Sequence, residues 1–382
     1  MTPLFHNLSK RIPSIFFILL TVKCFAQFTP EYAKSIPAGI VYGFRADYGS
    51  TVVHTPAVKI IKGAKPIGFG FELSKQAKDS ATYRLCSAFP RVGLQLQYFH
   101  YDSWVIGNSA IASYFIQPVY RLNNRLNFFY RASIGVSYSD HPYDNNPEKD
   151  TLNQNYSLRI NPYLQLASGL GFRIDKHLSL DVSGTFDHIS NGNWKRPNKG
   201  LNWITGSVSL LYSPTGSTLP NLHRVHDKYW KGRPWGYTFG SLLVTKQGYS
   251  GFTAGYQRMF AAGGFAEADK QIGRIHGLVV GIQAYHNDLK LDPYNPLQAY
   301  SLQKHTSVLA GVYGGHEFLL GRVIISQVLG LYITPHYREY TNLFHQHSFR
   351  YLLDKHWQVG FCLKAHADAA DFTGINVLYR LK

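Results

Sequence analysis

Polar and apolar residues alternate along most of this chain with a period of two. The pattern is clearest at residues 94–99, 132–138 and 178–190. Successive side chains of a β-strand point to opposite faces, so the alternation predicts strands with one apolar face. We expect strands at 37–47, 67–75, 90–100, 110–121, 126–138, 159–173, 177–190, 201–212, 235–245, 250–261, 275–286, 306–318, 321–333, 355–366 and 371–381.

The first 26 residues follow a different pattern. Lys10 and Arg11 precede an apolar run at 15–22, and the small residue Ala26 follows. This order is typical of a secretory signal peptide, and we expect cleavage after Ala26. The exported chain would then begin at Gln27.

An exported chain of many amphipathic strands indicates a β-barrel. After the signal, no segment reaches the roughly 18 uncharged apolar residues that a spanning helix needs. The composition, 15% aromatic with 34 Gly, 27 Tyr and 2 Met, suits strands better than helices. We predict an all-β, transmembrane outer-membrane antiparallel β-barrel in a Gram-negative envelope. A secreted β-sandwich shows the same alternation and is the alternative.

The predicted strands total fifteen, whereas single-chain bacterial barrels normally have an even number, so we expect about 14 to 16. The connections at 122–125 and 174–176 are short, and those at 139–158 and 191–200 are longer. Such barrels have short periplasmic turns and long outer loops. Residues 191–200 are therefore expected at the outer rim.

The net charge of the chain limits the kinds of molecule that it is expected to bind. The formal charge is +17, and loss of residues 1–26, which contain three basic and no acidic residues, leaves +14. This balance favours anionic partners. At an outer membrane the expected polyanion is lipopolysaccharide, whose lipid A carries phosphates. Export and the lack of a binding motif argue against nucleic acid.

The segment 139–158 is polar and contains Asp140, Asp144, Glu148 and Asp150. Carboxylates can bind a divalent cation, but this spacing matches no known loop motif. We expect a solvated outer loop and no metal site.

The most informative segment runs from residue 188 to residue 202. His188 and Ser190 end a face that is otherwise apolar, and Asn202 begins the next strand on the same face. Polar groups that face lipid are costly and tend to be functional. The plainer interpretation is a rim histidine beside an ordinary turn rich in Asn, Gly and Pro.

These residue types suit nucleophilic acyl chemistry. A histidine beside a serine can take the hydroxyl proton while the serine attacks a carbonyl. The side-chain oxygen of Asn202 can accept from the imidazole N–H and fix its tautomer. The turn supplies backbone or side-chain amides as candidate oxyanion donors. These candidates are Asn191, Gly192, Asn193 and Asn198.

The segment also resembles a known family. The run His188-Ile-Ser-Asn-Gly-Asn193, followed by Pro197-Asn, Gly200 and Asn202, is similar to the signature of the lipid A 3-O-deacylases (PagL-type), which are grouped with acyloxyacyl hydrolases. Upstream, His54-Thr-Pro-Ala-Val, Lys65-Pro-Ile-Gly-Phe-Gly-Phe-Glu72 and Pro90-Arg-Val-Gly resemble members from Bacteroidetes-like bacteria. The resemblance covers roughly residues 40–213.

The resemblance implies an outer-membrane barrel whose lipid-facing Ser-His-Glu triad removes an ester-linked acyl chain from lipid A without a metal or cofactor. Carried over, Ser190 is the nucleophile, His188 the general base and Asn198 a side-chain oxyanion donor. The backbone oxyanion donor falls at Asn193, where the family has glycine. The triad acid falls at Asn202, so this sequence departs from the family there.

A neutral amide can orient an imidazole, but it stabilises the imidazolium less than a carboxylate does. Three interpretations stay open: a slower or retuned esterase, another carboxylate that replaces the acid, or a barrel that has lost the activity. Asp187 is adjacent, but the alternation points it into the lumen. We expect an active serine esterase.

The family's eight strands are accounted for by the first half of the chain. We expect residues 27–214 to form deacylase-like strands and residues 215–382 to continue the same, wider barrel. An eight-stranded barrel with appended strands is the alternative. A wide barrel can conduct solutes. The rival function is thus a non-catalytic porin or surface-binding protein.

Overall fold

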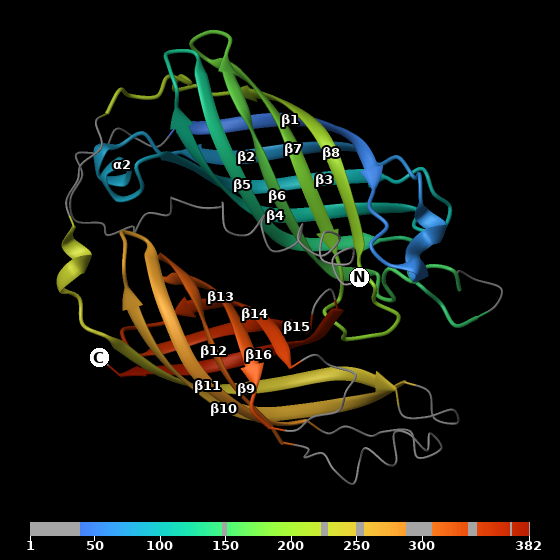
Figure 1. The fold of residues 1–382 in the computed structure, drawn as a ribbon. Helices are drawn as coiled ribbons and strands as arrows, with labels where there is room; N and C mark the ends of the chain where they lie inside the picture. Colours follow the sequence, from blue (N-terminus) through green and yellow to red (C-terminus); the bar gives the residue numbers. More distant parts are fainter. Residues whose placement is uncertain are drawn as a thin grey trace, which may run out of the picture.

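The computed structural model describes residues 39–146, 151–222, 228–249, 256–287, 308–334, 342–366 and 369–381. Within these ranges, sixteen antiparallel strands form two closed barrels (Figure 1). The predicted signal peptide lies outside the described residues, as do the first residues of the strands expected at 37–47, 250–261 and 306–318.

The first barrel contains the first eight strands. These are β1 (Gly39–Thr51), β2 (Ile67–Gln76), β3 (Phe89–His100), β4 (Asn108–Arg121), β5 (Leu126–Ser139), β6 (Ile160–Arg173), β7 (Leu178–Ile189) and β8 (Leu201–Tyr212). Consecutive strands pair, and β8 returns to pair with β1, with Trp203 opposite Thr51. Two short helices lie in its connections, a 3-10 helix at Pro56–Ile61 and α2 at Ser80–Cys86.

The second barrel contains the other eight strands. These are β9 (Gly236–Tyr249), β10 (Tyr256–Gln271), β11 (His276–Asn287), β12 (Val308–Leu320), β13 (Val323–Tyr332), β14 (Leu343–Leu352), β15 (Trp357–His366) and β16 (Ala369–Leu381). β16 pairs with β9, which closes this barrel. A 3-10 turn at Tyr229–Gly232 lies in the connection between the barrels.

The expectation of one wide barrel is therefore wrong. The alternative of an eight-stranded barrel with an appended β unit is the observed arrangement, and the appended unit is itself a closed barrel. The alternation could not decide this, because it reports which face of a sheet a side chain occupies and not which distant strand closes the ring.

The alternation did not predict one of the observed strands, β14. β14 has His345 and His347 on one face, while Gln346, Ser348 and Arg350 alternate with them on the other. Both faces are thus partly polar, and the usual contrast between the faces is lost. With β14 included, each barrel has eight strands, the even number expected of this class.

The outward faces of both barrels are apolar, as a lipid-facing surface requires. Exposed large apolar side chains occur on strands of both barrels. They include Phe44, Phe69, Leu94, Leu96, Val182, Ile204, Phe239, Leu243, Ile282, Leu329 and Ile375. Among the described residues, no helix has the length and apolar character needed to cross a membrane.

The inward faces are polar and carry buried ion pairs. In the first barrel, Arg131 lies 2.6 Å from Glu72, and Arg91 lies 2.9 Å from Asp181. In the second, Arg350 lies 2.6 Å from Glu267. These side chains are almost fully buried, so they fill the interiors of the two barrels. This packing does not favour the transport alternative, which requires an open lumen.

Candidate active site

The candidate site lies at one end of the β7–β8 hairpin. His188 of β7 is directly opposite Asn202 of β8, and Ser190 follows the end of β7. All three lie on the outward face and are half-buried, whereas the flanking Ile189 and Leu201 point inward and are fully buried. The alternation had predicted this shared face. The connection beyond Ser190 lies at the same end of the barrel as the long segments 52–66 and 140–159, which we assign as the outer end.

The three side chains form one hydrogen-bonded chain. His188 Nε2 lies 3.0 Å from Ser190 Oγ, and His188 Nδ1 lies 2.5 Å from Asn202 Oδ1. An amide oxygen only accepts, so Nδ1 carries the hydrogen and Nε2 can take the proton of the serine hydroxyl. This is the geometry that a serine nucleophile and its base require.

A fourth side chain extends this chain. His54 lies in the connection between β1 and β2, and its Nδ1 is 3.0 Å from Asn202 Nδ2. Its Nε2 is 2.8 Å from the carbonyl oxygen of Lys199. The sequence pointed to the His54 segment only by resemblance. Its contact with Asn202 depends on the closure of β1 against β8, which spacing along the chain does not reveal.

No carboxylate replaces the expected triad acid among the described residues. Asp187 points into the barrel, as the alternation predicted. It accepts hydrogen bonds from Tyr163 (2.5 Å), Gln165 and Thr185. The imidazole of His188 contacts the amide of Asn202 instead.

The amide groups of the turn after Ser190 differ in whether they are already hydrogen-bonded within the protein. The N–H of Asn191 donates to Asn198 Oδ1 (2.8 Å), and the side chain of Asn191 donates to Lys195 and Ser157. Asn191 therefore has no donor left for a substrate. Because Asn198 Oδ1 is occupied, its NH2 group points the other way and remains a candidate donor.

Gly192 and Asn193 follow with positive φ angles of 58° and 70°. Among the described residues, neither backbone N–H has a hydrogen-bond acceptor. The Asn193 side chain is engaged elsewhere, since its Nδ2 donates to the carbonyl of Asp371 and its Oδ1 accepts from Arg196. Of the candidates at 192 and 193, we therefore keep only the backbone N–H groups, although both residues are buried.

Residues of the second barrel form hydrogen bonds with this turn. The N–H of Gln247 donates to the carbonyl of Asn193 (3.2 Å), and Gln247 Oε1 accepts from the N–H of Arg196 (2.9 Å). Arg258 donates to the carbonyl of Trp194 (2.9 Å). These contacts were not predicted, because they join residues on separate barrels.

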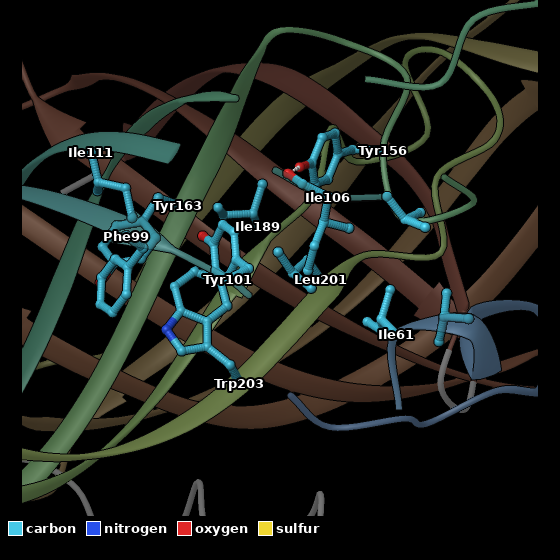
Figure 2. Close-up of a cluster of buried hydrophobic side chains, with 12 residues drawn as sticks. Ile61, Phe99, Tyr101, Ile106, Ile111, Tyr156, Tyr163, Ile189, Leu201 and Trp203 are labelled. Carbon is cyan, nitrogen blue, oxygen red and sulfur yellow. Dashed lines mark hydrogen bonds between the residues drawn. The ribbon is translucent and has the colours of Figure 1, made fainter. Parts of the chain in front are cut away.

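A buried aromatic cluster supports the site from inside the first barrel (Figure 2). Trp203 follows Asn202, and its ring packs edge-on against Phe99 and Tyr101, with centroids 5.3 Å apart in each pair. Ile189 and Leu201 belong to the same cluster. Close packing of these neighbours fixes the backbone that carries His188 and Asn202.

The acidic segment at 139–158 forms no metal site among its described residues. Asp140 instead accepts from the backbone N–H of Asn108 (2.7 Å) and contacts His141. Partial burial opposes its ionisation, but these hydrogen bonds outweigh burial and hold the pKa of Asp140 below its usual value. Asp144 accepts from the N–H of Asn146. Glu148 and Asp150 lie outside the described residues.

The fold defines an outer-membrane β-barrel protein. Residues 66–210 match the family model of the lipid A 3-O-deacylases (PagL), and residues 236–382 match that of the acyloxyacyl hydrolase C-terminal domain. The chain therefore belongs to the PagL-type lipid A 3-O-deacylase and acyloxyacyl hydrolase family, as the sequence resemblance predicted. The first match covers β2–β8 of the first barrel, and the second covers all eight strands of the second barrel. No curated protein matches the chain significantly.

Solved structures also show similarity. The crystal structure of the outer membrane enzyme PagL is 18% identical, covers 44% of this chain and 97% of its own, and has a TM-score of 0.30. The COG4313 outer membrane channel from Pseudomonas putida F1 is 8% identical, covers 93% and 99%, and has a TM-score of 0.22. The KdgM porin is 6% identical, covers 72% and 95%, and has a TM-score of 0.18.

Proposed function

We propose that this protein is an outer-membrane esterase that hydrolyses an ester-linked acyl chain of lipid A. The observation that carries the proposal is the Ser190–His188–Asn202 hydrogen-bonded chain on the outward face of the first barrel. An acyl ester in the outer leaflet would reach this face without leaving the membrane. The family to which the chain belongs supports the choice of lipid A.

The reaction would begin with proton transfer from Ser190 Oγ to His188 Nε2 as the oxygen attacks the ester carbonyl. The resulting oxyanion would be held by the side-chain NH2 of Asn198 and the backbone N–H groups of Gly192 and Asn193. Collapse of this intermediate breaks the ester bond, and the departing sugar oxygen takes the proton from His188. Water then releases the fatty acid from Ser190 by the same steps.

Asn202 would hold the imidazole in its tautomer without adding a negative charge. It would therefore stabilise the imidazolium less than a carboxylate does, and we expect a slower esterase than one with an acid at this position.

Lys195 and Lys199 are exposed on the turn between Ser190 and Asn202, where their positive charges suit the phosphates of lipid A. The predicted signal peptide at residues 1–26 would provide export.

The direct test is the lipid A profile of Gram-negative cells with and without the full chain. We expect mass spectra of cells that make the protein to show lipid A lighter by one acyl chain, together with the corresponding free fatty acid. Spectra that are identical in the two strains, with the barrel confirmed in the outer membrane, would contradict the proposal.

A second prediction concerns Gly200, which precedes β8. Its φ is 81°, and a Cβ there would lie 2.8 Å from Cε1 of His188. Gly200→Ala would strain the backbone and push the imidazole away from Ser190. Because a displacement of about 1 Å can cost about 100-fold in rate, we expect kcat/KM for lipid A to fall by about that factor.

Gly184→Ala is the matched control for Gly200→Ala. Gly184 lies on the same outward face of β7, and a Cβ there meets no atom within 4 Å. Its kcat/KM should equal that of the unmodified protein. Equal rates for the two alanine variants would show that His188 need not keep the observed position.

A further inference from the structure

The neutral amide of Asn202 can face His188 in two orientations that differ chemically, whereas a carboxylate presents an oxygen in both. The two oxygens of a carboxylate both accept, whereas an amide has one accepting and one donating end. If the amide of Asn202 turned over, its NH2 group would face His188 Nδ1. The imidazole would then carry its hydrogen on Nε2, and Nε2 could no longer take the proton of Ser190. The orientation of one amide therefore decides whether the serine has a base.

The contacts of His54 determine this orientation. The carbonyl oxygen of Lys199 can only accept, so His54 Nε2, 2.8 Å away, must carry the hydrogen in the neutral ring. His54 Nδ1 is then an acceptor, and the group 3.0 Å from it must be the NH2 of Asn202. This directs Asn202 Oδ1 toward His188. Each donor in the chain from Ser190 to Lys199 thus meets an acceptor.

The backbone on both sides of this contact is fixed. The N–H of Val52 donates to the carbonyl of Asn202 (2.8 Å), which ties the His54 segment to β8. Just after His54, Val58 and Ile61 are buried in the aromatic cluster behind the site. The N–H groups of Lys199 and Gly200 donate to the carbonyls of Gln154 and Asn155. His54 and its acceptor therefore have defined positions.

We propose that His54 is a positioning residue, which holds the Asn202 amide in the one orientation that leaves His188 able to act as a base. His54 itself has no contact with Ser190, since Asn202 and His188 lie between them. It compensates for the missing triad acid by making the orientation of the substituting amide unambiguous. This inference rests on the proposed function of the same site.

Two near-isosteric substitutions separate the roles of the His54 nitrogens. In His54→Asn, the side-chain oxygen occupies the place of Nδ1 and can still accept from Asn202. In His54→Gln, the amide nitrogen occupies the place of Nε2 and can still donate to Lys199, but the acceptor for Asn202 is lost. We expect kcat/KM for lipid A to stay within about 3-fold in His54→Asn and to fall about 10- to 100-fold in His54→Gln, by analogy with the loss of a hydrogen-bond partner that orients a metal-binding histidine.

A merely structural role predicts a different order. If His54 only fills space or braces the loop, the Asn and Gln variants should lose similar activity, and this result would overturn the inference. Heat-modifiable migration of each full-length variant checks that the barrel still folds.

Replacing the amide with a carboxylate gives a second, independent readout. In the Asn202→Asp background both oxygens of the new side chain accept, so His188 no longer depends on His54 for its tautomer. We expect His54→Ala to cost at least about 10-fold when Asn202 is present and less than about 3-fold in the Asn202→Asp background. Equal losses in both backgrounds would show that the two residues are uncoupled, contrary to the proposal.

These measurements distinguish failure of the proposed function from failure of the positioning role of His54. If the unmodified protein does not deacylate lipid A, the proposed function fails. If it does and the His54 variants match it, only the positioning role fails.

Discussion

Ser190→Ala is expected to abolish deacylation of lipid A, with kcat reduced by about 10⁶-fold, the size of the loss when the serine nucleophile is removed from a triad. The hydroxyl lies 3.0 Å from His188 Nε2 and is the only nucleophile in the hydrogen-bonded chain. Without it, the histidine has no oxygen to activate for attack. Release of fatty acid by the purified full-length protein, followed by mass spectrometry, measures the effect.

Ser168→Ala is a matched control for the nucleophile. Ser168 is an exposed serine on the outward face of the neighbouring strand β6, opposite Gly184 of β7. It has the same chemistry and the same lipid-facing environment but no histidine partner. We expect this variant to keep full activity. A Ser190→Ala protein that retained a tenth or more of the original rate would show that the esterase uses another site.

The second large effect is expected on stability, from Glu72 inside the first barrel. Glu72 is 2% exposed and lies 2.6 Å from Arg131 and 3.5 Å from Arg91. Glu72→Gln keeps the shape of the side chain but removes the charge between two buried guanidinium groups. Breaking a buried ion pair on one side costs about 3–5 kcal/mol, and we expect a loss of unfolding free energy of about this size.

Because each barrel closes on itself, the loss should be confined to one of them. Hydrogen exchange in the native protein, resolved to individual strands, is the suitable measurement. We expect faster exchange in β1–β8 and unchanged exchange in β9–β16. Glu267→Gln, which removes the nearer of the two carboxylates paired with Arg350 in the second barrel, should give the reverse pattern. Faster exchange in both barrels with either variant would mean that they unfold as one unit.

The alternation along the chain determined most of the local structure. It placed fourteen strands close to their observed positions, whereas the strand expected at 250–261 is β10 at Tyr256–Gln271, which ends ten residues later. It also put His188, Ser190 and Asn202 on one outward face, with Asp187 on the other. These features depend only on the period-two geometry of a strand. The family resemblance added the expected roles of the three side chains and the expectation of an acid where this chain has Asn202. β14 was missed because its outward histidines removed the contrast between faces.

Other features were decided only by contacts between distant parts of the chain. Closure of β8 onto β1 makes two barrels instead of one and brings His54 to Asn202. The second barrel contacts the turn that carries the candidate oxyanion donors. The orientation of the Asn202 amide follows from a hydrogen-bond chain that ends at Lys199. Sequence periodicity reports the face on which a side chain lies, whereas these contacts depend on which strands meet, and only the tertiary structure decides that.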